Sequence, residues 1–431
     1  MKTILLGLNE LNFEYIKFYS NKGLLPNFKN ILTSYKLVET QSEDKYELLE
    51  PWIQWATVHT GKTFSEHQIF RLGDIVNSNE EQLFEFLESK GLSIGAVSPF
   101  NAKNVLNNPA FFIPDPWTIT PVSGNWFVNA LYRAIHQSVN DNASGRLSFA
   151  TLATLAFGVV RIVSFKKYPQ YLKCLINRKK PGMKAVILDS LLADTYLYLL
   201  KKHDPDFSNL FLNSGAHIQH HYLFNSDAYN GKLINPDWYC KKDYDPLIVV
   251  LKLYDRLIGD LLKTNMNIIL ATGLHQQPHE DLTFYWRINK HEDFIQQLGL
   301  EGVRKVLPRM SRDFLIEFES EAKAFKAEEI LNSFIMNKDQ SKVFKIDNRG
   351  ESLFIELIYS SEIIESDKIL SKKYNFKIHN FRKLVSFVAI KNGEHNGTGY
   401  FIYDPEKFKA RISKKILLSD VRGIIEKIVL S

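Results

Sequence analysis

Cysteine is nearly absent from this chain of 431 residues, which has only Cys174 and Cys240. Two cysteines so far apart form neither a disulfide framework nor a metal-ligand spacing, so we expect a reducing compartment. No stretch reaches the roughly 20 apolar residues needed to cross a bilayer, and the longest apolar run is Phe149–Val160. The short apolar run at the amino terminus is not a signal-peptide core. The sequence therefore predicts a cytoplasmic protein, either free or peripheral to the inner membrane.

A strong excess of one charge is also missing. The chain has 54 basic and 48 acidic residues and a net charge of +6. This balance excludes the concentrated positive charge of a nucleic-acid binder. It suits a partner with modest negative charge, either an anionic small molecule, a glycan or lipid-linked substrate, or an anionic membrane surface.

Short apolar runs alternate with helical stretches over most of the chain, which is the pattern of an α/β fold with a doubly wound, mostly parallel sheet. Expected strands lie at 3–8, 93–97, 209–212, 267–271, 385–390 and 400–403. Expected helices lie at 13–21, 27–34, 80–90 and 247–262, the first with Asn12 as its N-cap. The expected core takes residues 1–120, 201–300 and 381–431, with a small subdomain or sheet-edge elaboration at 301–380.

Residues 121–200 interrupt this alternation and predict a helical cap or insertion. The apolar run Phe149–Val160 lies here, followed by a basic tract whose charged residues are Arg161, Lys166, Lys167, Lys173, Arg178, Lys179, Lys180 and Lys184. One interpretation is a buried helix followed by a solvated charged loop. The other is a surface for a membrane or a lipid-linked substrate.

Polar clusters follow three of the expected strands, and ligands of open α/β sheets bind beyond the carboxyl ends of the strands. We therefore expect a shared crevice, formed by Asn9, Glu10, His217, His220 and His275. His217 and His220 share a helix face at i, i+3 spacing, and neutral imidazoles are good zinc ligands.

Two further segments add candidate site residues. His395 lies in the glycine-rich stretch 392–399, which predicts either a loop that approaches a ligand closely or a hairpin tip. The segment 46–70 offers the Glu50 carboxylate, the Thr57 hydroxyl and Trp55, which lines a pocket or fills the core. Asn101, shortly after the expected strand 93–97, is a further candidate for substrate binding.

Several of these segments occur in the order of motifs from a known family. They are Leu6–Asn12 with Gly23–Phe28, Trp55–Lys62 with Glu66–Ile69, Ala216–His220, Ile269–His275 and Gly393–His395. Together they resemble the alkaline phosphatase superfamily, in its type I phosphodiesterase and nucleotide pyrophosphatase branch. The resemblance implies an alkaline-phosphatase-like fold and chemistry at a phosphate ester.

In the family that this sequence resembles, aspartates and histidines usually hold two metals and a Thr or Ser is the nucleophile. The sequence departs from that pattern. The aspartate positions of that family fall on Asn9, Ala216 and Gly273 or Leu274, and its nucleophile position falls near Glu50. The expected metal ligands are therefore His220 and His395 with His217, holding one zinc or other divalent metal, or none. Glu50, Glu10 and His275 are then the expected catalytic residues, and the expected substrate-binding residues are Asn9, Trp55, Thr57, His217 and Asn101.

Three hypotheses of function follow from these observations. The first is a phosphoester hydrolase or transferase that acts on a nucleotide- or lipid-linked anionic substrate in bacterial surface-glycan metabolism. The second is a glycosyltransferase-like enzyme that uses a sugar nucleotide, with Glu50 as base. The third is a degenerate protein that binds a glycan or a partner without catalysis.

Overall fold

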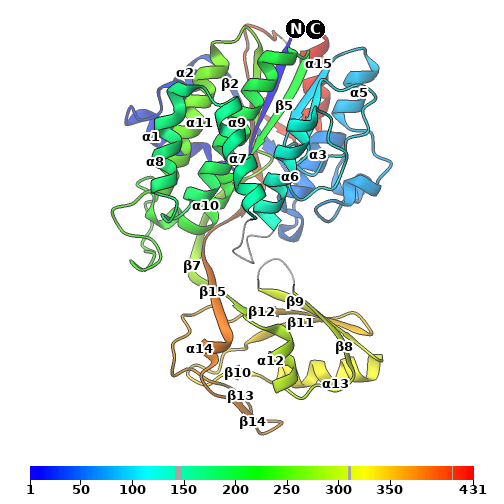
Figure 1. Ribbon diagram of the computed structural model, residues 1–431, viewed down its shortest axis with the longest axis vertical. Helices are drawn as coiled ribbons and strands as arrows, with labels where there is room; N and C mark the ends of the chain where they lie inside the picture. Colours follow the sequence, from blue (N-terminus) through cyan, green and yellow to red (C-terminus); the bar gives the residue numbers. More distant parts are fainter. Residues whose placement is uncertain (141–147, 309–311, 410) are drawn as a thin grey trace. The chain divides into compact units, whose positions relative to one another are not determined.

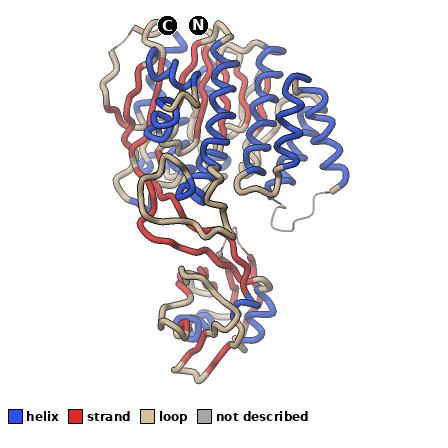
Figure 2. Tube along the Cα trace, turned by 90° about the vertical axis from the view of Figure 1, so that its left-hand side faces the viewer, coloured by secondary structure: helices blue, strands red, loops and turns tan. Residues whose placement is uncertain are grey.

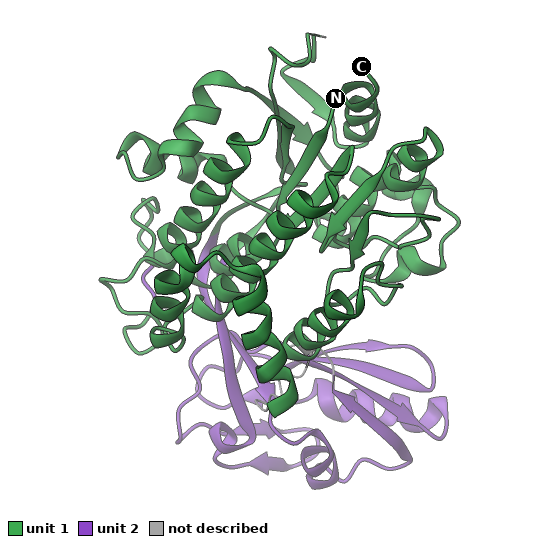
Figure 3. Cartoon of the chain, turned by 45° about the horizontal axis from the view of Figure 1, so that its top comes forward, with its two compact units in different colours: residues 1–232, 236–278, 393–431 green, residues 233–235, 279–392 purple. Residues whose placement is uncertain are grey.

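The computed structural model describes residues 1–140, 148–308, 312–409 and 411–431. The chain divides into two compact units, the first made of residues 1–232, 236–278 and 393–431, and the second of residues 233–235 and 279–392 (Figure 3). The chain leaves the first unit along β7 (His275–Ile288) and returns along β15 (Val385–Asn396), and these two strands pair with each other. The range 301–380, expected as a small subdomain, lies inside the second unit.

The first unit is built on an eight-stranded sheet with the order β17-β2-β16-β6-β1-β5-β3-β4. Its strands are β1 (Thr3–Leu8), β2 (Lys36–Gln41), β3 (Ile94–Val97), β4 (Phe111–Ile113), β5 (Phe207–Leu212), β6 (Asn267–Ala271), β16 (Thr398–Tyr403) and β17 (Lys415–Leu417). Only β16 runs antiparallel to its neighbours, so the sheet is mostly parallel, as the sequence predicts.

Helices cover both faces of this sheet (Figures 1 and 2). The side chains of β1 alternate between two cores, with Ile4, Leu6 and Leu8 on one face and Leu5 on the other. The first face packs against α1 (Phe13–Asn21), α2 (Pro26–Ser34), α9 (Met183–His203) and α11 (Pro246–Leu262). The second packs against α3 (Pro51–Thr60), α5 (Leu83–Ser89) and α15 (Asp420–Leu430). The doubly wound architecture expected from the sequence is confirmed.

Short polar motifs set several helix boundaries. Asn12 caps α1 as expected, accepting a hydrogen bond from the Glu14 amide, and Asp245 caps α11 in the same way. The expected helix 80–90 is shorter, because Gln82 and Glu85 form the capping box and α5 begins at Leu83. The remaining short helices of the first unit are η1 (Tyr46–Leu48), α4 (Phe64–His67), η2 (Asp74–Asn77), α10 (Ser214–Tyr222) and η5 (Leu223–Asn225).

Residues 121–200 are helical, as predicted, and form α6 (Trp126–Asn140), α7 (Phe149–Ile162), η4 (Phe165–Lys167), α8 (Tyr168–Ile176) and α9. Helix α7 packs on α6 and α9, and α8 packs on α9. Within the described residues, no single helix is long and apolar enough to span a membrane, although α7 and α8 together pass that test as a pair bent by 119°.

The second unit is a separate α+β assembly. Its larger sheet is antiparallel and has the order β11-β12-β9-β8, and a smaller sheet has the order β10-β13-β14. The strands are β8 (Val303–Pro308), β9 (Asp313–Phe318), β10 (Ile335–Met336), β11 (Phe344–Asn348), β12 (Ser352–Leu357), β13 (Ile369–Ser371) and β14 (Phe376–Ile378). The helices are α12 (His291–Gln297), α13 (Glu321–Asn332) and α14 (Phe381–Leu384).

Candidate functional site

The carboxyl ends of three central strands meet at one edge of the large sheet. Leu8 of β1 is in register with Leu212 of β5, so Asn9 and Asn213 follow side by side. The Asn9 amide donates to Leu212 O at 3.1 Å, and the Glu10 amide donates to Thr272 O, just after β6, at 3.1 Å. The predicted convergence of Asn9 and Glu10 with the ends of β5 and β6 is therefore present.

Glu10 has an unusual backbone conformation, with φ of 54° in the left-handed region. Such a conformation costs a residue other than glycine about 1–3 kcal/mol and persists where the surroundings fix it. Here the Glu10 carbonyl accepts from the Gln276 amide at 3.1 Å and from Gln219 Nε2 at 3.0 Å. These bonds hold a buried carboxylate at the end of β1, with 2% of the residue exposed.

Two histidines from distant segments contact this carboxylate. His220 on α10 places Nε2 at 2.9 Å from Glu10 Oε2, and His395 on β15 places Nε2 at 3.2 Å from the same oxygen. The two Nε2 atoms are themselves 3.2 Å apart. Glu10, His220 and His395 thus form one compact group of three donor atoms, which we call the Glu10 group.

Helix α10, which carries His220, is fixed at its start by a buried network. Asp189 on α9 accepts from the Ser214 amide at 2.8 Å and from the Tyr254 hydroxyl at 2.6 Å. Tyr254 in turn accepts from the Gly215 amide at 2.9 Å. Burial raises the pKa of the Asp189 carboxyl and of the Tyr254 phenol. This network satisfies the first amides of α10 and sets the direction in which His220 leaves the helix.

The Glu10 carboxylate is oriented by two side-chain amides. Gln276 Nε2 donates to Oε2 at 2.6 Å, and Asn9 Nδ2 donates to Oε1 at 2.9 Å. Asn9 is held in turn by Trp55, whose Nε1 donates to Asn9 Oδ1 at 2.8 Å. Outer-sphere partners of this kind are typical of metal ligands.

Charge within the group favours the ionised carboxylate. Burial raises the pKa of Glu10, but the positive charges of His395 and His220 and their hydrogen bonds outweigh it. The pKa of Glu10 therefore lies well below its usual value. Glu10 is therefore an anion that pairs with the two imidazoles.

The geometry of the three donor atoms fits a divalent metal. Zinc binds imidazole nitrogen and carboxylate oxygen at about 2.0–2.1 Å, so two ligand atoms of a tetrahedral site lie about 3.3 Å apart. The three edges of the triangle in the Glu10 group measure 2.9, 3.2 and 3.2 Å. Among the described residues, these three form the group that can hold a metal. Two histidines and a glutamate also match a known catalytic zinc set with one open position.

The structure does not place the other expected histidines in this group. His217, expected as a third ligand, is exposed and lies edge-on to His221 with ring centroids 4.9 Å apart. The third donor atom of the group comes from Glu10, which we expected to be a catalytic residue. His275, expected as a catalytic residue, bonds the Thr398 carbonyl through Nδ1 at 2.6 Å and packs against Tyr400.

His395 lies on strand β15 and not in the loop that the glycine-rich stretch suggested. The stretch 392–399 is not a loop, because β15 continues to Asn396 and β16 begins at Thr398. Gly393 is needed for close packing, since a Cβ atom there would lie 2.8 Å from Gln219 O.

The expected substrate-binding residues on and beside α3 have structural contacts. The Thr57 hydroxyl is buried and contacts the Ile53 carbonyl and His67 Nε2, both at 3.2 Å. Asn101 is fully buried and bonds the Trp52 carbonyl and the Gly73 amide. Trp55 fills the core as well as contacting Asn9. Glu50 is half-buried and is the N-cap residue of α3, with Pro51 after it.

Some residues of the site were not predicted from the sequence patterns. Gln276, Gln219, Asp189 and Tyr254 were not expected. Gln276 and Gln219 are near the ends of β6 and β5, and that position alone could have marked them. Asp189 and Tyr254 lie inside long helices and become recognisable only through their contacts.

No protein-family model matches the chain, and no curated protein matches it either. Solved structures that are similar in fold include phosphonoacetate hydrolase from Sinorhizobium meliloti 1021, at 11% identity and a TM-score of 0.44, covering 100% of this chain and 96% of the other. Human ectonucleotide pyrophosphatase/phosphodiesterase 5 is also similar, at 11% identity and a TM-score of 0.43, covering 100% and 95%. Both are members of the alkaline phosphatase superfamily, which is the superfamily that the sequence motifs of this chain resemble.

Proposed function

We propose that this chain is a metal-dependent phosphoester hydrolase or phosphotransferase whose active site is the Glu10 group. The observation that carries the proposal is the triangle of Glu10 Oε2, His220 Nε2 and His395 Nε2, with edges of 2.9 to 3.2 Å. Three protein ligands leave one position open, which is the arrangement of catalytic rather than structural zinc.

Each residue of the group has a defined task. Glu10, His220 and His395 hold the cation, while Gln276 and Asn9 keep the carboxylate in place. When bound, a divalent cation polarises a phosphoryl oxygen and lowers the pKa of a bound water. The single carboxylate supplies one negative charge, so the site suits one dication better than an adjacent pair.

Glu50 is the residue that we assign to proton transfer. It precedes α3, and Trp55 of that helix is bonded to Asn9, so the first turns of α3 lie beside the carboxyl end of β1. The start of α3 offers its positive dipole end to a phosphate. Pro51 follows Glu50, and neither residue offers a hydroxyl nucleophile.

The reaction that follows is direct transfer. An oxygen of water, or of an acceptor hydroxyl, forms a bond to phosphorus while the bond from phosphorus to the leaving oxygen breaks. The Glu50 carboxylate takes the proton of the attacking oxygen, and the leaving oxygen takes a proton from solvent. No covalent intermediate on the protein is required.

The substrate class we propose is a small anionic phosphoester. The phosphonoacetate hydrolase structure contains phosphonoformate, and a structure of the murine ectonucleotide pyrophosphatase/phosphodiesterase 5 contains AMP. A nucleotide- or lipid-linked donor from surface-glycan metabolism, handled in the cytoplasm, is the finer form of this proposal. The mild positive charge of the chain suits such a substrate.

The test combines metal analysis with turnover. Purified protein is assayed for bound zinc, manganese and iron, and for hydrolysis of bis-p-nitrophenyl phosphate and of sugar nucleotides. We expect one metal per chain and release of p-nitrophenol, both lost in His220→Ala. The matched control is His217→Ala on the same helix, which should keep its metal.

Two outcomes would contradict the proposal. Sugar transfer from a nucleotide without phosphodiester turnover would select the glycosyltransferase hypothesis. Ligand binding with neither metal nor turnover would select the non-catalytic hypothesis.

A further inference from the structure

Helix α7 presents its apolar side chains outward. Phe149, Leu152, Phe157 and Val160 are 87%, 50%, 48% and 67% exposed. Their spacing places them on one stripe of the helix, which in a soluble protein normally faces the core. Only Thr151 and Gly158 of α7 are buried. The interpretation of this run as a buried helix is therefore wrong.

The same feature continues through η4 and α8. Phe165, between the two helices, is 73% exposed, and Leu172, Leu175 and Ile176 of α8 are 60%, 49% and 71% exposed. Helix α8 is anchored from its other side by Tyr171, whose hydroxyl donates to Asp194 on α9 at 2.8 Å. We call this exposed set the apolar face, made of Phe149, Leu152, Phe157, Val160, Phe165, Leu172, Leu175 and Ile176.

The charge around the apolar face has one sign. Between Asn142 and Leu188 the sequence has nine basic residues and no acidic one, so the rest of the chain is slightly acidic. Lys167 is neutralised by Asp194 and Asp260 from neighbouring helices, at 2.7 and 3.1 Å. The exposed basic residues of the described part are Arg161, Lys166, Lys173, Arg178, Lys179, Lys180 and Lys184.

We propose that the apolar face docks the protein on an anionic lipid membrane, lying at the headgroup boundary without crossing the bilayer. Exposed Phe, Leu, Ile and Val side chains beside lysines are the composition of interfacial helices. Apolar insertion and attraction of Lys and Arg to anionic headgroups then act together. Exposed large apolar side chains in this number mark an interaction site in a soluble domain.

The charge pattern favours lipid over the other occupants. A second copy of the chain would bring two acid-free basic segments together, and like charges repel. A nucleic acid would match the charge but leave the aromatic and aliphatic side chains without a partner, since its backbone is polar and charged. Only an anionic lipid surface satisfies both the apolar and the basic side chains.

The experiment is co-sedimentation of the full chain with vesicles. One set contains an equal mixture of phosphatidylcholine and phosphatidylglycerol, and the other phosphatidylcholine alone. We expect binding to the mixed vesicles that weakens with salt, and little binding to the neutral ones. No binding to the mixed vesicles would overturn the proposal.

Variants assign the binding to the apolar face. Leu172→Glu with Ile176→Glu should lower vesicle affinity more than tenfold, and Lys179→Glu with Lys180→Glu should lower it roughly fivefold for each lysine lost. The matched control is Phe325→Glu with Ile364→Glu, also 60% and 52% exposed but outside the face, and it should bind as the unchanged protein does.

Two controls keep the result interpretable. Bound metal and thermal unfolding are measured for each variant, so that a misfolded variant is recognised. The milder pair Phe149→Ser and Val160→Asn repeats the test on α7. Equal affinity of the face variants and the control would overturn the proposal. So would self-association that Leu172→Glu with Ile176→Glu abolishes, if vesicles bind no protein. Neither outcome depends on the Glu10 group.

Discussion

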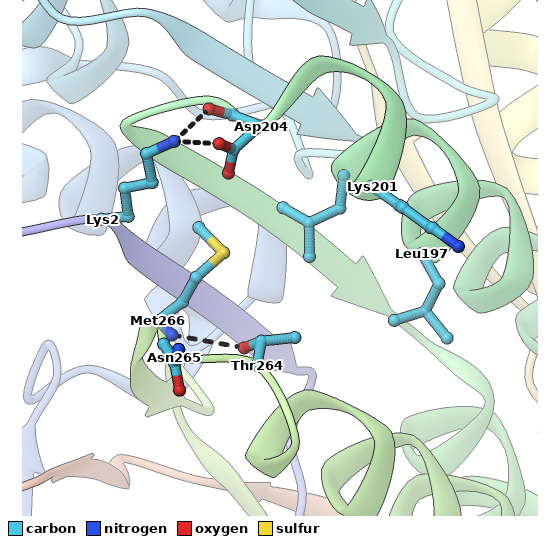
Figure 4. A pocket seen from close by; sticks show the side chains of 8 residues that line it. Lys2, Leu197, Lys201, Asp204, Thr264, Asn265 and Met266 are labelled. Carbon is cyan, nitrogen blue, oxygen red and sulfur yellow. Dashed lines mark hydrogen bonds and ion pairs between the residues drawn. The ribbon is translucent and has the colours of Figure 1, made fainter.

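The two ends of the large sheet contrast sharply. At the carboxyl end, Glu10 after β1, His220 after β5 and His395 on β15 bring a buried carboxylate and two imidazoles within hydrogen-bond distance. At the amino end, a pocket is lined by Lys2, Leu197, Leu200, Lys201, Asp204, Thr264, Asn265 and Met266 (Figure 4). Its main polar contact is the exposed pair between Lys2 and Asp204. A hollow without convergent buried donors is not a catalytic site.

Left-handed backbone conformations occur at both ends, but only those at the carboxyl end include a buried carboxylate. Glu10, Ser98 and Asn101, which follow β1 and β3, have φ values of 54°, 56° and 47°. Strained residues persist only where the surrounding bonds fix them, and they gather at functional sites. At the amino end, Asp204 also has a left-handed φ of 48°, but it is the residue that ends α9 and its side chain is exposed.

Removing a ligand should have the largest effect. His395→Ala takes one nitrogen from the triangle, and we expect loss of the bound metal and a fall in phosphodiester turnover of more than about 100-fold. Metal analysis and steady-state kinetics measure both. If the variant keeps its metal and its turnover, His395 is not a metal ligand, and the carboxyl end of the sheet is no better a candidate for the functional site than the amino end.

Removing an orienting amide should have a smaller effect. Gln276→Leu keeps the side-chain size but takes away the donor at 2.6 Å from Glu10 Oε2. We expect metal affinity to fall about 10- to 100-fold, measured by competition with a chromophoric chelator. Gln296→Leu, an exposed glutamine on α12, is the control. Equal affinities would mean that Gln276 only fills space.

A buried histidine outside the site can be compared with the Glu10 group through the pH dependence of stability. His59 is fully buried, bonds the Phe100 carbonyl at 3.1 Å, and burial lowers its pKa to about 4. The unfolded chain, with a pKa near 6.5, takes up the proton first as pH falls. Stability is therefore constant above about pH 6.5 and decreases toward pH 4, by about 2 kcal/mol at pH 5 from this residue.

His59→Phe removes that titration. In urea unfolding, the free-energy difference between the unchanged protein and the variant should shift by about 2 kcal/mol between pH 8 and pH 5, in favour of the variant at low pH. Metal content at pH 8 should not change. The same difference at both pH values would show that His59 does not titrate as described.

The smallest effect is expected at the amino end. Lys2→Ala breaks a pair whose side chains are 39% and 70% exposed, and such pairs contribute about 0.2–1 kcal/mol or less. Thermal unfolding should therefore shift little, and metal content and turnover should be unchanged. Loss of turnover in this variant would move the functional site to the other end of the sheet.

The framework of the site was predictable because it depends on local patterns. The boundaries 3–8, 13–21 and 267–271 are those that the structure has. Apolar runs ending in polar residues also placed Asn9, Glu10 and His220 at one edge, because parallel strands share a direction. Such patterns identify which segments meet.

The partners within the site were less predictable, because they depend on contacts between distant residues. Gln276 and Glu10 are 266 residues apart, and an amide side chain has no periodic signal. Glycine at 393 predicted a loop, whereas it is needed for close approach inside a strand. Likewise, composition alone does not tell a buried apolar helix from an exposed one, so both interpretations of α7 stayed open until its exposure was seen.

The central claim is tested most directly by crystals grown with zinc, from the anomalous scattering at the zinc edge. We expect one peak about 2.0–2.2 Å from Glu10 Oε2, His220 Nε2 and His395 Nε2. No peak at these three atoms, with zinc bound elsewhere or not at all, would contradict it.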